Sequence, residues 1–296
     1  KLRQRIYELG GDPDAVEEDW AALASDSPKN EMIEIKPSIF MMGALLRDKE
    51  ADEDEKPRHK VTLSRRFLIG KSPVTQALWT SIMSDNPSHF KGSSRPVEMV
   101  GWLDSLVFCN RLSEKEGFEK VYALPKDTER WLKRQKGDRD KDIDTLSGKV
   151  SQNLNANGYR LPTEAEWEYC ARAGETFLYS GSDNADDVAW FGIDFHDKSN
   201  LGNSFGQTHP VLQKKPNAFG LCDMSGNVWE WVWDRKGEYA NAAVLDPTGP
   251  MAGMSRVTRG GCWRGGSWGT RVSGRYWYYP SYRNSNLGFR LTRSVR

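Results

Sequence analysis

A chain of 296 residues with 38% hydrophobic content can bury one large core, or two modest ones, without a metal or disulfides. The formal net charge of +1 excludes a molecule-wide electrostatic surface for nucleic acid or an anionic membrane. The charge is unevenly distributed, because an acidic run from Asp48 to Glu55 is offset by a stretch from Ser255 to Arg296 with nine Arg and no Asp, Glu or Lys.

Residues 1–31 are predicted to form a small helical accessory segment, with two polar helices separated by Gly10, Gly11 and Pro13. From residue 32 onward, short apolar runs are broken by turns. IEI at 33–35, FMMG at 40–43 and HKVTLSRRFLIG at 59–70 are therefore predicted strands.

Three helices are predicted. Thr75 opens TQALWTSIM, and WLDSLVFCNRL has apolar residues at one-face spacing. In RLPTEAEWEYCARAG, Thr163 and Glu166 form a capping box and Gly174 ends the helix. Residues 126–157 are rich in Lys and Asp, which predicts a solvated surface insertion.

The run GNVWEWVWD predicts a strand, because Trp229, Trp231 and Trp233 recur with a period of two. Three tryptophans on one face of a strand are typical of core packing. We expect them to be buried.

The segment from Cys262 to Ser285 mixes seven aromatic residues with glycines, Arg and Ser. Tyr and Trp beside small residues are typical of binding surfaces, where rigid rings give contact area at low entropic cost. Trp263, next to the GG turn, is expected in the core. The other six rings are expected to form one exposed patch: Trp268, Tyr276, Trp277, Tyr278, Tyr279 and Tyr282. Single-stranded nucleic acid is the weaker alternative ligand, because no basic track and no Lys accompany these rings.

Seven motifs occur in order between about residue 32 and residue 296: FMMG, RHKVTLSRRFLIGKSPVTQALW, RPVEMVGW, GYRLPTEAEWEYCARAG, NAFGLCDMSGNVWEWVWD, RVTRGG and LGFRL. Together they resemble the formylglycine-generating (sulfatase-modifying factor) domain. The resemblance implies an α+β fold of the C-type lectin type over residues 32–296, rich in loops, with few short strands and about three helices.

The enzymes of that family use a pair of cysteines between the RGG turn and the LGFR strand to handle copper and oxygen. Here the four cysteines, Cys109, Cys170, Cys222 and Cys262, form no CxxC pair, and only Cys262 lies in that interval. The family's iron chemistry needs a histidine cluster, whereas the four histidines are scattered. We therefore expect no catalytic residues and no enzyme activity, with a formylglycine-generating type of oxidase as the disfavoured alternative.

The C-terminal segment also resembles the variable region of proteins diversified by retroelements, as in the lectin-fold variable proteins of spirochaetes (Treponema). That resemblance implies a variable region at about 256–290, in which fixed anchors alternate with substituted positions. The expected anchors are RGG at 259–261, Trp263, Arg271, Arg275, Pro280, Arg283 and NLGFR at 286–290. The expected ligand-binding positions are Cys262, Arg264, Gly265, Gly266, Trp268, Gly269, Gly274, Tyr276, Trp277, Tyr278, Tyr279, Ser281, Tyr282 and Ser285. Trp cannot arise from an Asn codon by changing adenines, so Trp268 and Trp277 imply another template codon.

Family resemblance also suggests a structural calcium ion at Asn227 and Glu230, with plain hydrogen bonding of Glu230 as the equal alternative. No other cofactor is expected.

We expect a monomer that binds a macromolecular ligand and no nucleic acid. A protein is the favoured ligand over a sugar. The expected location is the cell surface or the extracellular space, with any membrane attachment through a lipid anchor or signal outside this chain.

Overall fold

The computed structural model describes residues 31–135, 139–193 and 201–295. Within them the chain forms six α-helices: α3 Gln76–Met83, α4 Trp102–Lys115, α5 Thr128–Arg134, α6 Lys141–Ser147, α7 Glu164–Arg172 and α8 Ala185–Val188. Two 3-10 helices are also present: η1 Glu53–Glu55 and η2 Ser267–Thr270. No helix in the described ranges has the length and apolar character needed to cross a bilayer.

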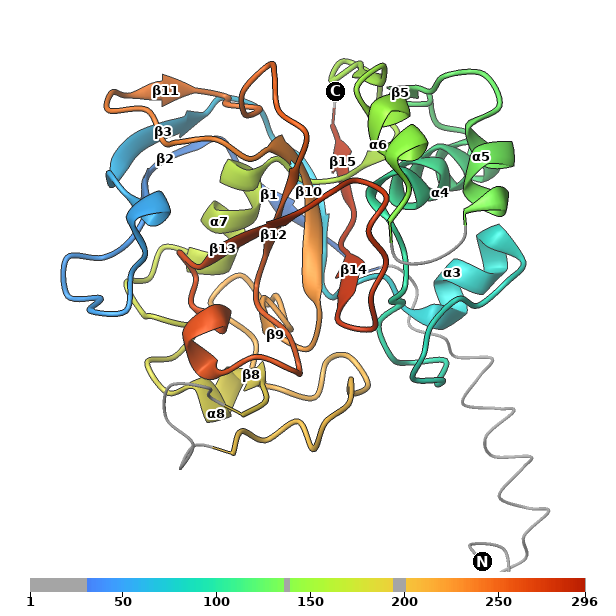
Figure 1. The fold of residues 1–296 in the computed structure, drawn as a ribbon. Helices are drawn as coiled ribbons and strands as arrows, with labels where there is room; N and C mark the ends of the chain where they lie inside the picture. The colour runs from blue at the N-terminus through green and yellow to red at the C-terminus, as the bar shows by residue number, and fades with distance from the viewer. Residues whose placement is uncertain (1–30, 136–138, 194–200, 296) are drawn as a thin grey trace, which may run out of the picture.

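The strands form three larger sheets and two strand pairs (Figure 1). The first sheet has the order β1-β4-β15-β7: Met32–Ile35, Phe67–Gly70, Thr292–Ser294 and Tyr159–Arg160. The second has the order β13-β12-β10-β14: Arg275–Tyr278, Arg256–Arg259, Trp229–Arg235 and Leu287–Phe289. The third has the order β11-β3-β2: Val244–Leu245, His59–Leu63 and Ser38–Met42. The pairs are β5-β6, Tyr122–Ala123 with Ser151–Gln152, and β8-β9, Ala189–Trp190 with Ser225–Gly226.

Strand β10 lies at the centre of the molecule and is buried on both faces. Trp229, Trp231 and Trp233 belong to one hydrophobic core, which they share with side chains of α3, α4 and β14. Val232 points into the other core, with residues of α7, β3 and β4. The prediction that the three tryptophans are core residues is therefore confirmed.

Helix α7 lies where the sequence predicts it. The Thr163 hydroxyl accepts a hydrogen bond from the Glu166 amide (3.2 Å), and the Glu166 carboxylate accepts one from the Thr163 amide (2.8 Å). At the other end, Ala173 adopts a left-handed conformation and Gly174 follows with φ of 81°. The helix thus begins and ends through local hydrogen bonds that its own sequence encodes.

Two expectations need correction. The helix count exceeds the expected three, largely because residues 126–157, predicted to be a solvated insertion, contain α5 and α6. Leu132 and Ile143 from these helices are buried in the first core, so this segment folds against the domain despite its charged composition. The predicted N-terminal helices of 1–31 lie outside the described residues, apart from Glu31.

Candidate ligand-binding surface

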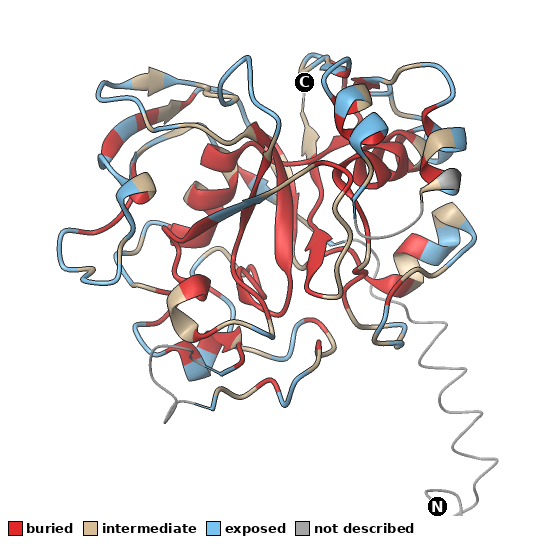
Figure 2. Ribbon diagram, in the orientation of Figure 1, coloured by how far each residue is buried: buried red, intermediate tan, exposed pale blue. Residues whose placement is uncertain are grey.

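Strand β13 is the edge of the second sheet and carries the exposed aromatic residues. Among the described strands it pairs with β12 alone, with Tyr276 opposite Thr258 and Tyr278 opposite Arg256. Figure 2 shows it as a pale blue and tan strand crossing in front of a buried sheet. Tyr276 is 43% exposed and Trp277 is 41% exposed.

Ring contacts connect five of the six predicted aromatic residues. Tyr276 lies 6.1 Å from Trp277 and 5.0 Å from Tyr278, between ring centroids. Tyr278 stacks on Tyr282 at 4.6 Å, and Trp277 meets Tyr279 edge-on at 6.4 Å. We call these five rings, Tyr276, Trp277, Tyr278, Tyr279 and Tyr282, the aromatic surface.

The aromatic surface is less exposed than predicted. Tyr278, Tyr279 and Tyr282 are half-buried, as is Trp268 on η2. Tyr276 and Tyr278 lean on Trp229 and Trp231, with centroids 5.8 and 6.2 Å apart. None of the six rings is fully buried. The aromatic surface therefore consists of partly accessible rings, two of which pack on the buried residues Trp229 and Trp231.

Five of the predicted ligand-binding positions are corrected, because their residues are buried: Cys262, Gly266, Gly269, Gly274 and Ser281. Cys262 lies in the first core, where its sulfur accepts a hydrogen bond from the Asn286 amide group (3.5 Å).

The backbone N–H of Ser281 donates to Asp144 (3.0 Å), and its hydroxyl accepts from the Asp140 amide (2.9 Å). Ser281 thus fixes the segment to α6. The Gly274 carbonyl accepts from Arg259 (2.7 Å), so the backbone there also serves to hold the chain.

The remaining predicted positions lie at or near the surface. Arg264 is exposed, and Gly265 and Ser285 are partly accessible. Trp263, predicted to be in the core, is half-buried and donates its indole N–H to the Ser285 carbonyl (2.9 Å). The segment therefore presents Arg264 and the aromatic surface, and buries residues 269–275 between them.

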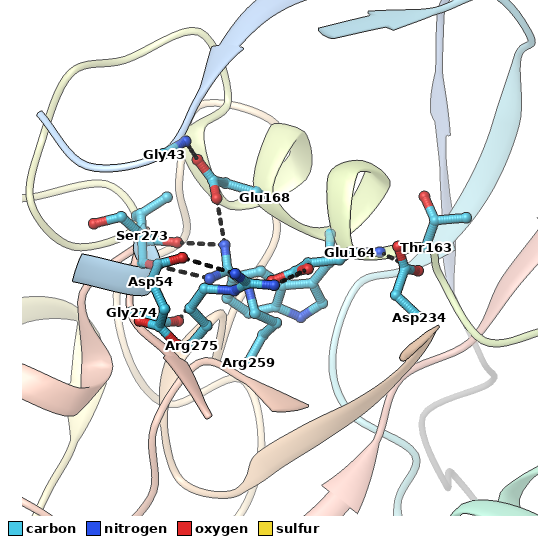
Figure 3. Close-up of polar contacts among 12 residues, drawn as sticks. Gly43, Asp54, Thr163, Glu164, Glu168, Asp234, Arg259, Ser273, Gly274 and Arg275 are labelled. Carbon is cyan, nitrogen blue, oxygen red and sulfur yellow. Dashed lines mark hydrogen bonds and ion pairs between the residues drawn. The ribbon is translucent and has the colours of Figure 1, made fainter. Parts of the chain in front are cut away.

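Buried ion pairs hold this segment in place. Arg275 makes a bidentate pair with Glu164 (2.7 and 2.8 Å), and Arg259 pairs with Glu168 (Figure 3). Two further buried pairs are Arg271 with Glu55 (2.7 Å) and Arg290 with Glu230 (2.8 Å). Arg283 makes a partly buried pair with Asp104 (2.8 Å). Guanidinium groups suit this task because their planar N–H donors match a carboxylate.

The carboxylate partners were not predicted from the sequence, although a signal for them exists. Arg271 also pairs with Asp48 (2.5 Å), and Arg275 donates to the Asp54 carbonyl (2.7 Å). The acidic run from Asp48 to Glu55 therefore meets the arginine-rich C-terminal stretch in space. Glu164 and Glu168 are one helical turn apart on α7, so one face of that helix receives two arginines.

The RGG turn needs its glycines for steric reasons. Gly260 and Gly261 have φ values of 94° and 73°, in the region that favours glycine. A Cβ atom on Gly261 would lie 2.6 Å from a Thr270 methyl group and 2.7 Å from the Gly269 carbonyl oxygen. These contacts explain why this anchor cannot carry a side chain.

The residues proposed for calcium are engaged in other interactions. The two Glu230 oxygens accept hydrogen bonds from Arg290 and from the Trp167 indole N–H (2.7 Å). The Asn227 amide group donates to Asp223 (3.2 Å) and to the His209 carbonyl (3.1 Å). Over the described ranges, no three His, Cys, Asp or Glu side chains are grouped to hold a metal. These contacts favour the hydrogen-bonding alternative, and calcium stays a prediction.

The thiols are poorly placed for redox chemistry. All four cysteines are free and buried. Burial raises the pKa of the Cys262 thiol, which opposes formation of the reactive thiolate. No second cysteine lies between the RGG turn and β14.

A buried carboxyl group lies beneath the loop next to Trp263. One oxygen of Glu98 accepts from the Phe90 amide (2.7 Å), and within the described residues the other oxygen has no hydrogen-bond partner. Phe90 packs edge-on against Trp263, with centroids 5.1 Å apart. Burial raises the pKa of Glu98 to about 7, opposed by weaker effects of the His89 and Phe90 amides and of Lys91.

We expect this group to reduce the free energy of unfolding as the pH rises from about 4.5 to about 7. Between these values the folded protein keeps the Glu98 proton and the unfolded chain releases it, so raising the pH favours unfolding. The Glu98→Gln variant cannot ionise and should show a flatter profile in urea denaturation across this range. A profile identical to the parent's would show that Glu98 does not cause the slope.

Comparisons with known proteins identify the family of this chain and a solved structure of similar fold. Residues 20–295 match the family model described as sulfatase-modifying factor enzyme 1-like domain. The structure of Treponema denticola variable protein 1 superposes with a TM-score of 0.74 at 35% identity, covering 89% of this chain and 95% of that one. The formylglycine-generating enzyme of Bos taurus is 30% identical over 292 residues, 89% of this chain and 75% of the enzyme.

A third relative, the chaperone protein LppX of Paenibacillus barcinonensis, is 45% identical over 185 residues, 59% of this chain. The match spans 64% of that protein, less than two thirds of its length. The expected fold class, a C-type lectin fold of the formylglycine-generating type, is confirmed by the family match and the Treponema structure. Because the family model covers all of the described residues, the chain belongs to the sulfatase-modifying factor enzyme 1-like family.

Proposed function

We propose that this protein is a non-catalytic binding protein that displays a retroelement-diversified surface to a macromolecular ligand, namely a protein. The proposal rests on one observation: within residues 259–290 some side chains hold the segment in place, and others are exposed. Four arginines of this segment are buried in ion pairs: Arg259, Arg271, Arg275 and Arg290. In contrast, Arg264, Tyr276 and Trp277 reach solvent. Side chains on such a scaffold can change without loss of the backbone that presents them.

The chemistry of the aromatic surface fits a protein ligand. Its rings supply broad, rigid contact area, and tyrosine hydroxyls add hydrogen bonding. The edge of β13 that pairs with no described strand also offers backbone groups to an extended segment of the partner. We further propose that the protein acts as a monomer at the cell surface or outside the cell, attached to any membrane through a segment outside this chain.

Two matched libraries test the proposal. One randomises Arg264, Tyr276, Trp277 and Tyr279, and the control randomises the buried residues Arg259, Arg271, Arg275 and Arg290. Both are displayed on yeast, scored for protease resistance, and selected for binding to lysozyme and to serum albumin. We expect most members of the first library to fold and some to bind, and most members of the control to be degraded. Equal loss of folded protein in both libraries would overturn the proposal.

Diversification of this surface by a retroelement is tested by examining the genomic neighbourhood of the gene. A near-identical template repeat beside a reverse transcriptase gene is expected near the gene for this chain. If neither is found there, the surface is a fixed binding site and the retroelement part of the proposal is wrong.

The alternative function is a formylglycine-generating type of oxidase, which family membership favours and the single Cys262 opposes. One assay distinguishes the two functions. The purified chain is incubated with copper, oxygen and a cysteine-containing sulfatase peptide, and the peptide aldehyde is sought by mass spectrometry. We expect none, and turnover that is lost in Cys262→Ser would instead establish the oxidase.

A further inference from the structure

A cavity lined by the second sheet, the third sheet and α7 contains a buried carboxyl group. Its volume is about 280 Å³, smaller than a typical drug-sized site and suited to a small molecule. The third sheet contributes Met42, His59 and Val244 to its lining, the second sheet contributes Asp234 and Arg275, and α7 contributes Glu164. None of the predicted variable positions lines it, so the cavity is separate from the ligand-binding positions of the C-terminal segment.

Asp234 is the carboxyl group in this cavity that lacks a cation. It lies near the end of β10 and is 3% exposed. The structure records one hydrogen bond for its side chain, in which Oδ2 accepts from the Glu164 amide (2.9 Å; Figure 3). No described residue forms a hydrogen bond with Oδ1 or an ion pair with either oxygen. The Oδ1 atom is therefore available to a ligand.

Burial makes this carboxyl group sensitive to a nearby cation. Burial, followed by the charge of Glu164, raises the pKa of Asp234 well above its usual value, and the hydrogen bond from the Glu164 amide opposes this. A carboxylate that is buried without a counterion is costly, and a cation in contact with it offsets that cost. A positively charged ligand would therefore be favoured at Asp234.

The other charged groups of the lining balance each other. Arg275 and Glu164 form the bidentate pair described above. Arg235 is partly accessible and Glu238 is exposed, and these two carry opposite charges. With Asp234 ionised, three carboxylates against two guanidinium groups leave one negative charge in the lining. A single positive charge on the ligand would neutralise it.

The remaining walls are apolar and aromatic. Met42 is buried, and Val244 and Pro247 are half-buried. The rings of His59 and Tyr239 pack against each other with centroids 4.8 Å apart. Apolar walls with a few polar groups are the usual composition of a small-molecule site. A short hydrocarbon chain can lie against these walls while a cation contacts Asp234.

We propose that this cavity binds a small primary alkylamine in its ammonium form, with an N–H donated to Oδ1 of Asp234 and the alkyl chain against Met42, Val244 and Pro247. An ammonium group places its charge and its N–H donors on one atom, so one available oxygen is sufficient for it. A guanidinium fork is matched by two oxygens, and Oδ2 is already occupied by a backbone amide. This site is independent of the function proposed for the aromatic surface.

Isothermal titration calorimetry with the purified chain tests the site, using butylammonium as the probe. The references are methylammonium, which lacks the chain, butanol, which lacks the charge, and butyltrimethylammonium, which lacks N–H donors. We expect butylammonium to bind at least about tenfold more tightly than each reference. Equal binding of butanol or butyltrimethylammonium would overturn the assignment of an ammonium group to Asp234. No heat with butylammonium at millimolar concentration would overturn the site.

Variants locate the binding. Asp234→Asn keeps an oxygen for the backbone hydrogen bond but removes the charge, and should weaken butylammonium binding at least about tenfold. Glu238→Gln is the matched control, because it removes an exposed carboxylate from the same lining, and should change the affinity by less than about twofold. Val244→Trp, which fills the cavity, should abolish binding. The double variant Tyr276→Ala, Trp277→Ala should bind butylammonium as the parent does.

Thermal melts show which variants fold. Undiminished binding in folded Asp234→Asn, or an equal loss in Glu238→Gln, would overturn the role of Asp234. If Asp234→Asn does not fold, Val244→Trp decides, and binding that survives in it would show that butylammonium binds elsewhere. Loss of binding in the Tyr276 and Trp277 variant would also place butylammonium outside this cavity.

Discussion

The Arg290→Met variant is expected to lose about 3–5 kcal/mol of the free energy of unfolding, because it leaves a buried carboxylate without its cation. Arg290 and Glu230 are both 0% exposed, and Arg290 is the cation that pairs with Glu230. The same guanidinium donates to the carbonyls of Gly70 and Cys222, each at 2.8 Å. Met fills part of the space but replaces none of these donors.

Urea denaturation gives the measurement, and two further variants separate the causes. Arg264→Met changes an exposed arginine of the same segment and should alter the free energy of unfolding by no more than about 0.5 kcal/mol. The double variant Arg290→Met, Glu230→Gln removes the buried charge and should recover part of the loss. If the double variant is as unstable as the single one, the lost hydrogen bonds to the carbonyls, and not the charge, explain the effect.

Features encoded within a few residues could be predicted from the sequence. The capping box at Thr163 and Glu166 starts α7 through hydrogen bonds three residues apart, so the sequence is sufficient to locate it. The period of two in Trp229, Trp231 and Trp233 likewise identified β10 and its buried face. Both signals depend on local geometry, which neighbouring residues fix.

Features that depend on distant residues could not be predicted in the same way. Arg271 and Glu55 are 216 positions apart, and their pairing depends on the tertiary fold that brings the acidic run beside the C-terminal stretch. Composition alone suggested that residues 126–157 are solvated, yet Leu132 and Ile143 are buried because α4 and the C-terminal segment provide a surface for them. Burial of a minority of apolar residues in a charged segment depends on its tertiary contacts.

The same reason explains why the candidate surface was only partly predicted. The mixture of aromatic and small residues indicated correctly that the rings of β13 are not fully buried, and the edge position of the strand leaves Tyr276 and Trp277 accessible. The sequence could not show that Cys262 and Ser281, each followed by a partly accessible aromatic residue, point inward to Asn286 and to α6. The two glycines gave no signal either: Gly269 lies near the Trp229 ring, and the carbonyl of buried Gly274 accepts a hydrogen bond from Arg259.

Truncation of rings in the core and on the aromatic surface should have very different effects on stability. Phe289 is 0% exposed and packs against Trp79 and Phe108, with centroids 6.1 and 5.4 Å apart. Phe289→Ala is expected to cost about 3–5 kcal/mol, because it removes buried apolar area and leaves a cavity between α3, α4 and β14. Tyr276→Ala and Trp277→Ala should each cost less than about 1 kcal/mol, because these rings keep much of their area in water.

Thermal melts and urea denaturation of the three variants decide between a structural and a binding role for the aromatic surface. Tyr278→Ala provides an internal calibration, since that ring stacks on Tyr282 and contacts Trp231, and its cost should fall between those of Tyr276→Ala and Phe289→Ala. Such a gradation would mean that stability follows burial and that the outermost rings are free to serve a ligand. Equal losses for Tyr276→Ala and Phe289→Ala would show instead that the rings of β13 hold the sheet edge together, and the binding surface would have to lie elsewhere.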